Sequence, residues 1–213
     1  MQLYFSPMSS SLAVRIALYE AGLPAEFIEV HLGTKRLSNG GDYREVHPLG
    51  LVPLLELENG ARLTEVAAIL TWIAERSGAV PTDLHERARL SQWLTFTASE
   101  LHLALFSPLL DATAPEAVRA YACARGEARL GWLSGQLEGR EWLGQTFSIA
   151  DVYLLTTLSW CAYTPIELHR WPTLLAYLKR GLKRPQVARA LAEEKVLYMA
   201  AQANEGAWAP RAG

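Results

Sequence analysis

Three consecutive serines near the start of the chain could do chemistry. Ser9, Ser10 and Ser11 follow a short apolar strand and a proline, and an apolar pattern with helical spacing begins beside them. The first amides of a helix lack intrahelical partners and the helix dipole is positive there, so this place favours an anion or a thiolate. Serine is also a preferred helix cap. The residues alone therefore leave two interpretations open, a thiolate or anion site and a helix cap.

A second group of polar residues lies on a helix that the spacing predicts over 83–106. Thr95, Ser99, His102 and Phe106 fall on one face of such a helix and could line a cleft. Histidine titrates near neutral pH, so His102 could hold a thiolate or move a proton. A lone histidine can also be purely structural.

The first eighty residues mix strand and helix patterns. Strands are expected at 3–5 and 27–32 around a helix at 11–21, and a hairpin turn at Asn59-Gly60 joins two more strands. A helix follows up to Gly78, and the loop-rich stretch before the hairpin could hold one short extra helix. A β-α-β unit implies parallel strands, while the hairpin adds an antiparallel edge. The sequence therefore predicts an α/β unit, β-α-β-β-β-α, with a mixed sheet.

Strand signals end near Pro81. Helices are expected at 83–106 and 115–137, and from Ser148, Pro172 and Pro185 onward. Ser148 and Asp151 form a capping box, with Asp in the place of Glu, so we assign Asp151 a structural role. We place the boundary near 78–83, which gives an α/β unit at 1–80 and an all-helical unit at 84–205.

Composition excludes several classes of protein. The net charge of −2 gives no electrostatic case for binding nucleic acid or an acidic membrane surface. No apolar run is long enough to cross a membrane, and no signal peptide is visible, so a cytoplasmic location is expected. Cys123 and Cys161 fit no metal or disulfide spacing and are expected as small buried side chains, suited to a reducing compartment.

Several motifs together resemble the cytosolic glutathione transferase family over nearly the whole chain. The resemblance to the bacterial beta class rests on the stretches 34–43 and 99–102. The motifs are LYFSP, TKRLSNGGDY, HPLGLVPLLEL, LTEVAAIL, SELH and WLGQTFSIADVYL.

The resemblance implies a thioredoxin-like N-terminal domain that binds glutathione and a helical domain that contributes the electrophile site. Glutathione is then the co-substrate, with no metal, in a cytoplasmic homodimer. Ser10 stands where the beta class has a cysteine that can form a mixed disulfide with glutathione. Serine cannot form one, so the resemblance implies that Ser10, with Ser11 as a rival, stabilises the glutathione thiolate.

The resemblance also implies a set of glutathione contacts. Val52 would offer its backbone beside a cis proline, although the X-Pro bond alone would favour trans. Glu65 would receive the γ-glutamyl ammonium group, and Lys35 the glycine carboxylate. The full set is Ser9, Lys35, Leu51, Val52, Pro53, Glu65, Val66, Thr95, Glu100 and Trp160.

Other positions carry implied roles on the helical side. His102 would lie near the sulfur, while Thr95 and Glu100 would reach the glutathione of the partner subunit. Trp160 would lie near the electrophile, although a core position suits it equally. Two residues depart from the family pattern: Val66 replaces a smaller residue and Leu103 replaces a lysine.

The sequence therefore predicts a glutathione S-transferase that conjugates glutathione to small electrophiles. One alternative is a weakly active or non-catalytic dimer of the same family with a binding or regulatory role. Another is a different glutathione-dependent reaction, such as dehalogenation, isomerisation or peroxide reduction.

Overall fold

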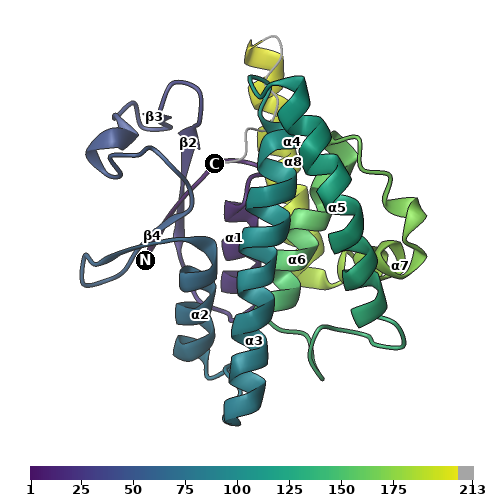
Figure 1. The fold of residues 1–213 in the computed structure, drawn as a ribbon. Helices are drawn as coiled ribbons and strands as arrows, with labels where there is room; N and C mark the ends of the chain where they lie inside the picture. Colours follow the sequence, from purple (N-terminus) through teal and green to yellow (C-terminus); the bar gives the residue numbers. More distant parts are fainter. Residues whose placement is uncertain (206–213) are drawn as a thin grey trace.

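A five-stranded mixed sheet forms the N-terminal half of the molecule. The structure is a computed structural model that describes residues 1–205 (Figure 1). The strand order is β3-β2-β1-β4-β5, with β1 parallel to β2 and antiparallel to β4. This confirms the predicted mixed sheet. The elements of this half are β1 (Gln2–Phe5), α1 (Ser11–Glu20), β2 (Glu26–His31), β3 (Arg36–Leu37), a 3-10 turn η1 (Tyr43–Glu45), β4 (Leu54–Glu56), β5 (Arg62–Thr64) and α2 (Val66–Ser77).

Two glycines end elements where the sequence predicts a stop. Gly60 has φ +79° in the turn between the antiparallel strands β4 and β5, which pair Leu54 with Thr64. Gly78 has φ +73° and caps the C-terminus of α2 in the left-handed conformation. Glycine adopts this backbone region without the steric cost of a Cβ atom. The hairpin and the end of α2 are therefore confirmed.

Helices make up the rest of the described chain. The elements are α3 (Leu84–Phe96), η2 (Thr97–Phe106), α4 (Ser107–Leu110), α5 (Glu116–Gln136), α6 (Ile149–Ser159), the 3-10 turns η3 (Trp160–Tyr163) and η4 (Leu168–Arg170), α7 (Pro172–Gly181) and α8 (Pro185–Glu205). None of the described helices combines the length and apolar character needed to cross a membrane.

The helix predicted over 83–106 changes its winding in the middle. After α3 the backbone is π-helical over η2, and the Ser107 N–H donates to the carbonyl of His102, five residues back. Pro108 follows and has no N–H to donate to Ala104, so the ordinary α-helical bond is missing there. π-helical turns are rare and often occur at functional sites. The predicted long helix is thus present, with α-helical winding in its first part and π-helical winding in its second.

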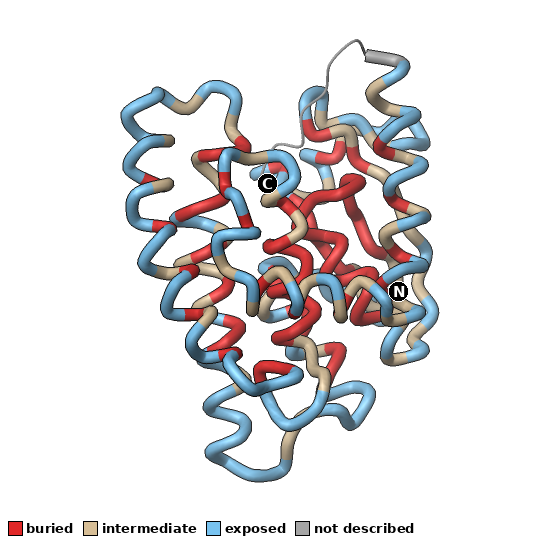
Figure 2. Tube along the Cα trace, turned by 90° about the vertical axis from the view of Figure 1, so that its right-hand side faces the viewer, coloured by how far each residue is buried: buried red, intermediate tan, exposed pale blue. Residues whose placement is uncertain are grey.

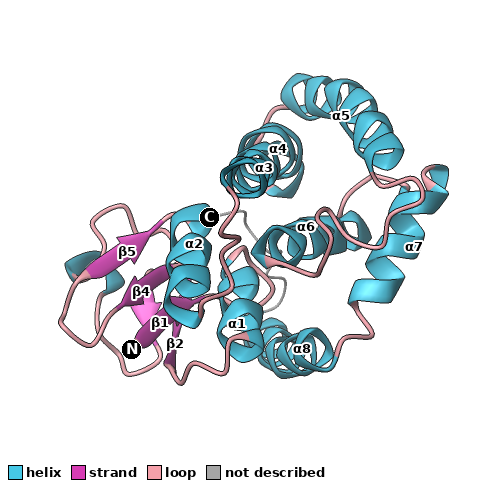
Figure 3. Ribbon diagram, turned by 90° about the horizontal axis from the view of Figure 1, so that it is seen from below, coloured by secondary structure: helices cyan, strands magenta, loops and turns pink. Residues whose placement is uncertain are grey.

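Helix α6 lies at the centre of the molecule. Every residue from Ala150 to Leu158 is buried, and seen from below α6 is surrounded by other helices (Figure 3). Buried positions of the two halves belong to one core, in which α1 packs against α6. Figure 2 shows the buried stretches gathered at the centre of the molecule. A helix that is apolar all round is typical of such a central position. Because the core is continuous, the division into units 1–80 and 84–205 stays a prediction.

The capping box at the start of α6 is confirmed, and it does more than cap. The carboxylate of Asp151 accepts hydrogen bonds from the backbone N–H and the hydroxyl of Ser148, both at 2.9 Å. It also accepts from the N–H of Leu143 and the hydroxyl of Tyr177, both at 2.8 Å. Asp151 therefore ties the loop before α6 and helix α7 to the centre of the core.

Candidate active site

A cleft of about 520 Å³ lies between the sheet half and the helical half. Its sheet side is formed by Ser10, by the loop that contains residues 47–53 and by residues 64–67. Its helical side is formed by residues between Thr95 and Ser107 and by Tyr153 of α6. The volume is in the range of small-molecule sites in proteins.

Only the middle serine of the three lines this cleft. Ser10 is almost fully buried, and its Oγ donates to the carbonyl of Val52 across a long 3.4 Å. The Oγ atoms of Ser9 and Ser11 are 2.8 Å apart, and Ser11 also bonds to the backbone N–H and carbonyl of Ser6. Ser9 and Ser11 thus stabilise the turn before α1, and Ser10 is the serine that faces the cleft.

The turn that leads to these serines is held by residues from the far end of the chain. Met8 has φ +62°, a strained conformation for a residue with a side chain. Its N–H donates to the carboxylate of Glu194 at 2.7 Å, and its carbonyl accepts from the indole N–H of Trp160 at 3.1 Å. Glu194 also pairs with Arg15 at 3.0 Å, and both side chains are buried. These contacts fix the approach of the chain to Ser10.

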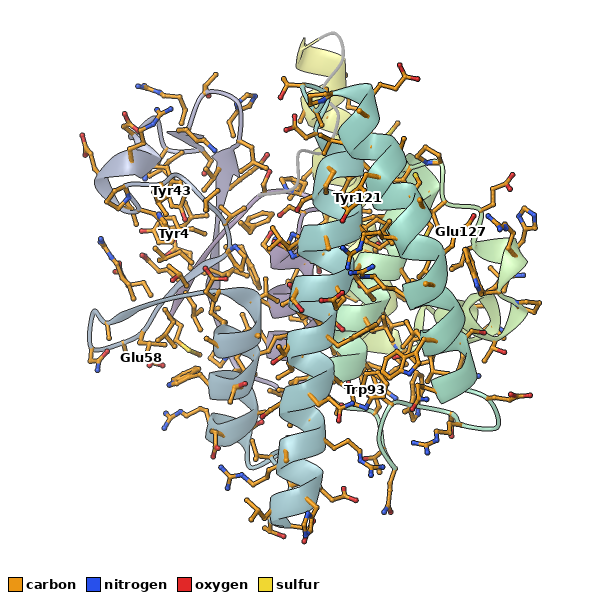
Figure 4. The ribbon with its side chains drawn as sticks, in the orientation of Figure 1. Tyr4, Tyr43, Glu58, Trp93, Tyr121 and Glu127 are labelled. Carbon is orange, nitrogen blue, oxygen red and sulfur yellow. The ribbon has the colours of Figure 1, made fainter. Side chains whose placement is uncertain are left out.

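The Val52-Pro53 peptide bond is cis, as the resemblance implies. Val52, Pro53 and the half-exposed Leu51 all line the cleft. The hydroxyl of Tyr43 donates to the carbonyl of Leu51 at 2.7 Å. Tyr43 also stacks on Tyr4 of β1, and Figure 4 shows the two rings side by side. The sheet thus supports the loop that carries the cis proline.

Glu65 is the one acidic side chain among the residues that line the cleft. It precedes α2 with φ +66° and ψ +118°, and its carboxylate makes no capping hydrogen bond. Val66 lines the cleft beside it and is buried, so its bulk packs into the core. The cleft has a volume of about 520 Å³ with this valine in its lining. Glu65 therefore offers a carboxylate to a ligand cation.

Lys35 does not line the cleft. Its Nζ donates to the carbonyl of Gly50 at 2.8 Å, in the loop that carries the cis proline. The resemblance implies a contact between this lysine and a ligand carboxylate. The structure places Lys35 against that loop, next to the cleft residues Leu49 and Leu51, and the implied contact stays a prediction.

His102 lines the cleft and is supported from behind by α6. Its Nδ1 lies 2.8 Å from the hydroxyl of Tyr153, which also lines the cleft. Burial raises the pKa of the Tyr153 hydroxyl well above its usual value, so this hydroxyl keeps its proton at neutral pH. Trp160 packs edge-on against the imidazole, with ring centres 4.9 Å apart, and does not reach the cleft. Trp160 therefore takes the core position that the sequence left open.

The remaining residues of the predicted helix face divide between the cleft and the core. Thr95 and Ser99 line the cleft with His102, whereas Phe106 is fully buried and packs against Trp160. Glu100 lies outside the cleft and accepts from Arg129 at 2.6 Å. Because η2 is π-helical, the α-helical spacing did not correctly place all four residues of the predicted face, Thr95, Ser99, His102 and Phe106.

The two cysteines are unpaired, and neither lines the cleft. Burial raises the pKa of the Cys161 thiol to about 12, so that thiol stays protonated at neutral pH. Among the described residues, no group of three or more His, Cys, Asp or Glu side chains could hold a metal ion.

Sequence reasoning missed two important supporting residues. Tyr153 was not predicted, although a tyrosine within an otherwise apolar central helix signals a hydroxyl that needs a partner. Glu194 was not predicted either, and its signal is weak because acidic residues are common on α8. Of the predicted site residues, the cleft brings together Ser10, Leu51, Val52, Pro53, Glu65, Val66, Thr95 and His102, and leaves out Ser9, Ser11, Lys35, Glu100 and Trp160.

Comparisons with known proteins agree on one family. Residues 7–76 match the N-terminal domain of glutathione S-transferase, and residues 110–180 match its C-terminal domain. The chain is 36% identical over 199 residues to the glutathione S-transferase GstA of Escherichia coli O157:H7, a match that covers 91% of this chain and 98% of GstA.

Solved structures indicate which class of this family the chain is similar to. A sphingomonad glutathione S-transferase complexed with glutathione is 39% identical, with a TM-score of 0.87 over 92% of this chain and all of that one. A bacterial beta-class glutathione S-transferase of Sphingomonas chungbukensis is 38% identical, with a TM-score of 0.86 over 91% of this chain and 98% of that one.

Proposed function

The chain belongs to the glutathione S-transferase family, and we propose that its cleft binds glutathione and adds the glutathione thiolate to small electrophiles. One observation carries the proposal. The cleft gathers a hydroxyl at the start of a helix, a backbone segment beside a cis proline, one carboxylate and one imidazole, namely Ser10, Val52, Glu65 and His102.

Three parts of glutathione, namely the ammonium group, the cysteinyl backbone and the thiol, have complementary groups in the cleft. The γ-glutamyl ammonium group meets the carboxylate of Glu65, which no capping bond engages. The cysteinyl backbone meets the N–H and C=O of Val52, as a peptide pairs with the edge of a strand. This arrangement places the thiol at Ser10, whose hydroxyl already lies against the Val52 carbonyl.

Ser10 lowers the pKa of the bound thiol by hydrogen bonding to its charged form. A free thiol has a pKa of about 8.5, so little thiolate exists at neutral pH. The 3.4 Å contact from Ser10 to Val52 is long, so the hydroxyl gives it up readily for a thiolate. A hydrogen bond to a charged group stabilises by about 1.5–3 kcal/mol, which corresponds to a fall of about one to two pKa units.

His102 adds a second donor. Nδ1 of His102 lies 2.8 Å from the protonated hydroxyl of Tyr153. We propose the tautomer in which that hydroxyl donates to Nδ1 and the ring proton lies on Nε2. An Nε2–H group can donate to a thiolate or pass a proton to the product. Tyr153 therefore positions His102 and sets its tautomer.

Residue 10 cannot take part in thiol–disulfide exchange. A mixed disulfide requires a cysteine, and residue 10 is serine. Neither cysteine of the chain lines the cleft. Conjugation, which needs a stabilised thiolate and no redox partner, is the reaction that suits these residues.

Titration calorimetry with glutathione tests the proposal directly. We expect saturable binding at millimolar glutathione or below, and absence of binding would overturn the assignment. Binding without turnover of any member of a panel of electrophiles would instead assign the chain a binding role.

The role of Ser10 needs a separate measurement. Ser10→Ala should raise the pKa of bound glutathione, followed by thiolate absorbance, by about one to two units. Ser99→Ala is the matched control, because its hydroxyl also lines the cleft but donates to the carbonyl of Thr95. Equal thiol pKa values in Ser10→Ala and the parent would transfer the role to His102.

We also propose that the chain forms a homodimer. Leu103 of η2 is 67% exposed, and Val118 and Tyr121 of α5 are 44% and 63% exposed. Leu103 and Val118 line the same surface pocket, and Tyr121 (Figure 4) lies one turn along α5 from Val118. Exposed apolar groups that lie together favour a protein partner. Sedimentation should give about 47 kDa, twice the 23.6 kDa of one chain, and Tyr121→Glu should shift the equilibrium toward the monomer. A monomeric parent protein would refute the dimer.

A further inference from the structure

The loop that carries the cis proline brings one polar side chain to the cleft that has no role so far. His47 is half-buried and lines the cleft together with Leu49 and Leu51, which are both apolar. Among the described residues that line the cleft there is no lysine and no arginine. His47 is therefore the polar side chain that this loop offers to a ligand.

The turn at the start of the loop fixes which nitrogen of His47 carries the proton. The backbone N–H of Leu49 donates to Nδ1 at 3.1 Å, so Nδ1 is an acceptor and holds no proton. In a neutral imidazole the proton then lies on Nε2, which becomes a donor. Nε2 is at the edge of the ring that faces away from this turn, and no hydrogen bond from residues 1–203 engages it.

Packing holds the ring and its loop in place. The ring centre of His47 lies 6.1 Å from that of Tyr43, whose side chain is fully buried. The hydroxyl of Tyr43 donates to the carbonyl of Leu51, and Nζ of Lys35 donates to the carbonyl of Gly50. A ligand therefore meets an Nε2–H group that is already in position, which lowers the entropy cost of binding.

The path of the chain places Val52 between Glu65 and His47. Glu65 directly follows β5, and Thr64 at the end of β5 pairs with Leu54 of β4. Val52 precedes Leu54, and the loop that contains His47 comes before Val52. A tripeptide whose ammonium group meets Glu65 and whose cysteinyl backbone meets Val52 therefore directs its glycine toward that loop.

We propose that the Nε2–H group of His47 donates to the glycine carboxylate of glutathione, and that this contact selects glutathione over thiols without that charge. The inference rests on the proposed function and adds a specificity-determining residue to it. A hydrogen bond to a carboxylate is about twice as strong as one between neutral groups. Lys35, which the family resemblance implies for this carboxylate, holds the loop through the carbonyl of Gly50.

Calorimetric titration of the full chain with glutathione and with its neutral analogue γ-glutamylcysteinylglycinamide tests the contact. The parent should bind glutathione about five- to tenfold more tightly than the amide. In His47→Asn this preference should fall to within about twofold. The asparagine oxygen can still accept from the N–H of Leu49, so this variant keeps the turn and loses only the donor at the far edge of the ring.

His31→Asn is the matched control. Nδ1 of His31 also accepts a backbone N–H, from Thr34 at 2.9 Å, and His31 does not line the cleft. This variant should keep the preference of the parent, and its loss there would overturn the proposal, because the effect would then come from the turn.

Two other outcomes would also overturn the role of His47. In the first, His47→Asn keeps the preference for glutathione over the amide. In the second, the parent binds the two ligands equally, which leaves the glutathione site itself supported. Absence of binding of either ligand would overturn the proposed function together with this contact.

Discussion

Replacing Asp151 by alanine should show how much one buried carboxylate contributes to the helical half. The change removes four accepted hydrogen bonds, from Leu143, from Tyr177 and twice from Ser148. The donors on Ser148 are only half-buried and can turn to water. The Leu143 amide and the Tyr177 hydroxyl belong to residues with 1% and 0% exposure, so they would be left without partners inside the core.

The magnitude follows from these two groups and the lost cap. A buried polar group without a partner costs about 1–3 kcal/mol, and loss of a helix cap costs about 0.5–2 kcal/mol. Burial also raises the pKa of the Asp151 carboxyl, so the cost of desolvating its charge offsets part of the stabilisation that these hydrogen bonds provide. We therefore expect Asp151→Ala to lower the free energy of unfolding by about 3–5 kcal/mol at neutral pH.

Urea unfolding followed by circular dichroism measures this loss. With a slope of about 2–3 kcal/mol per molar urea, the midpoint should fall by about 1–2.5 M. Ser148→Ala is the control, because it removes one donor and the cap alone and should cost about 0.5–2 kcal/mol. If Asp151→Ala costs no more than Ser148→Ala, the bonds to Leu143 and Tyr177 do not contribute as argued.

Three further changes test other parts of the structure. Tyr153→Phe should leave the glutathione Kd unchanged, lower kcat and alter the pH profile of kcat. The reason is that only the tautomer and orientation of His102 depend on that hydroxyl. An unchanged pH profile would contradict this role. Glu65→Gln should weaken glutathione binding about ten- to hundredfold in calorimetry through loss of a charge-assisted contact, with an unchanged urea midpoint as the check on folding. Burial raises the pKa of Glu194 from 4.5 to about 8, so folding takes up a proton between these values. The parent's unfolding free energy should therefore fall between pH 5 and 8 relative to that of Glu194→Gln, and parallel curves would disprove the shift.

Features whose partners lie close in sequence were predictable. The Asn59-Gly60 turn and the Ser148–Asp151 capping box are both confirmed, because the groups that form them are two to three residues apart. Local chemistry decides such features before tertiary packing acts. The cis bond before Pro53 came from the family resemblance, since the dipeptide itself favours trans.

Features that depend on distant contacts were not predictable. Of the three adjacent serines, Ser9 and Ser11 turn toward each other, and packing decides that Ser10 faces the cleft. The indole of Trp160 bonds to a carbonyl 152 residues away, so its core position could not be read from its neighbours. The π-helical winding of η2 had one local signal, Pro108, whose missing N–H the α-helical period did not take into account.

The strained turn at Met8 limits how this protein could be recombined with its relatives. The sheet half contains Ser10 but not the groups that set its approach, since Glu194 and Trp160 both belong to the helical half. A chimaera that joins residues 1–80 to a foreign helical half would keep every cleft residue of the sheet side. It would still lose the placement of Ser10 unless the new half supplied a carboxylate and an indole at the same two points. The two halves thus form a matched pair at Met8.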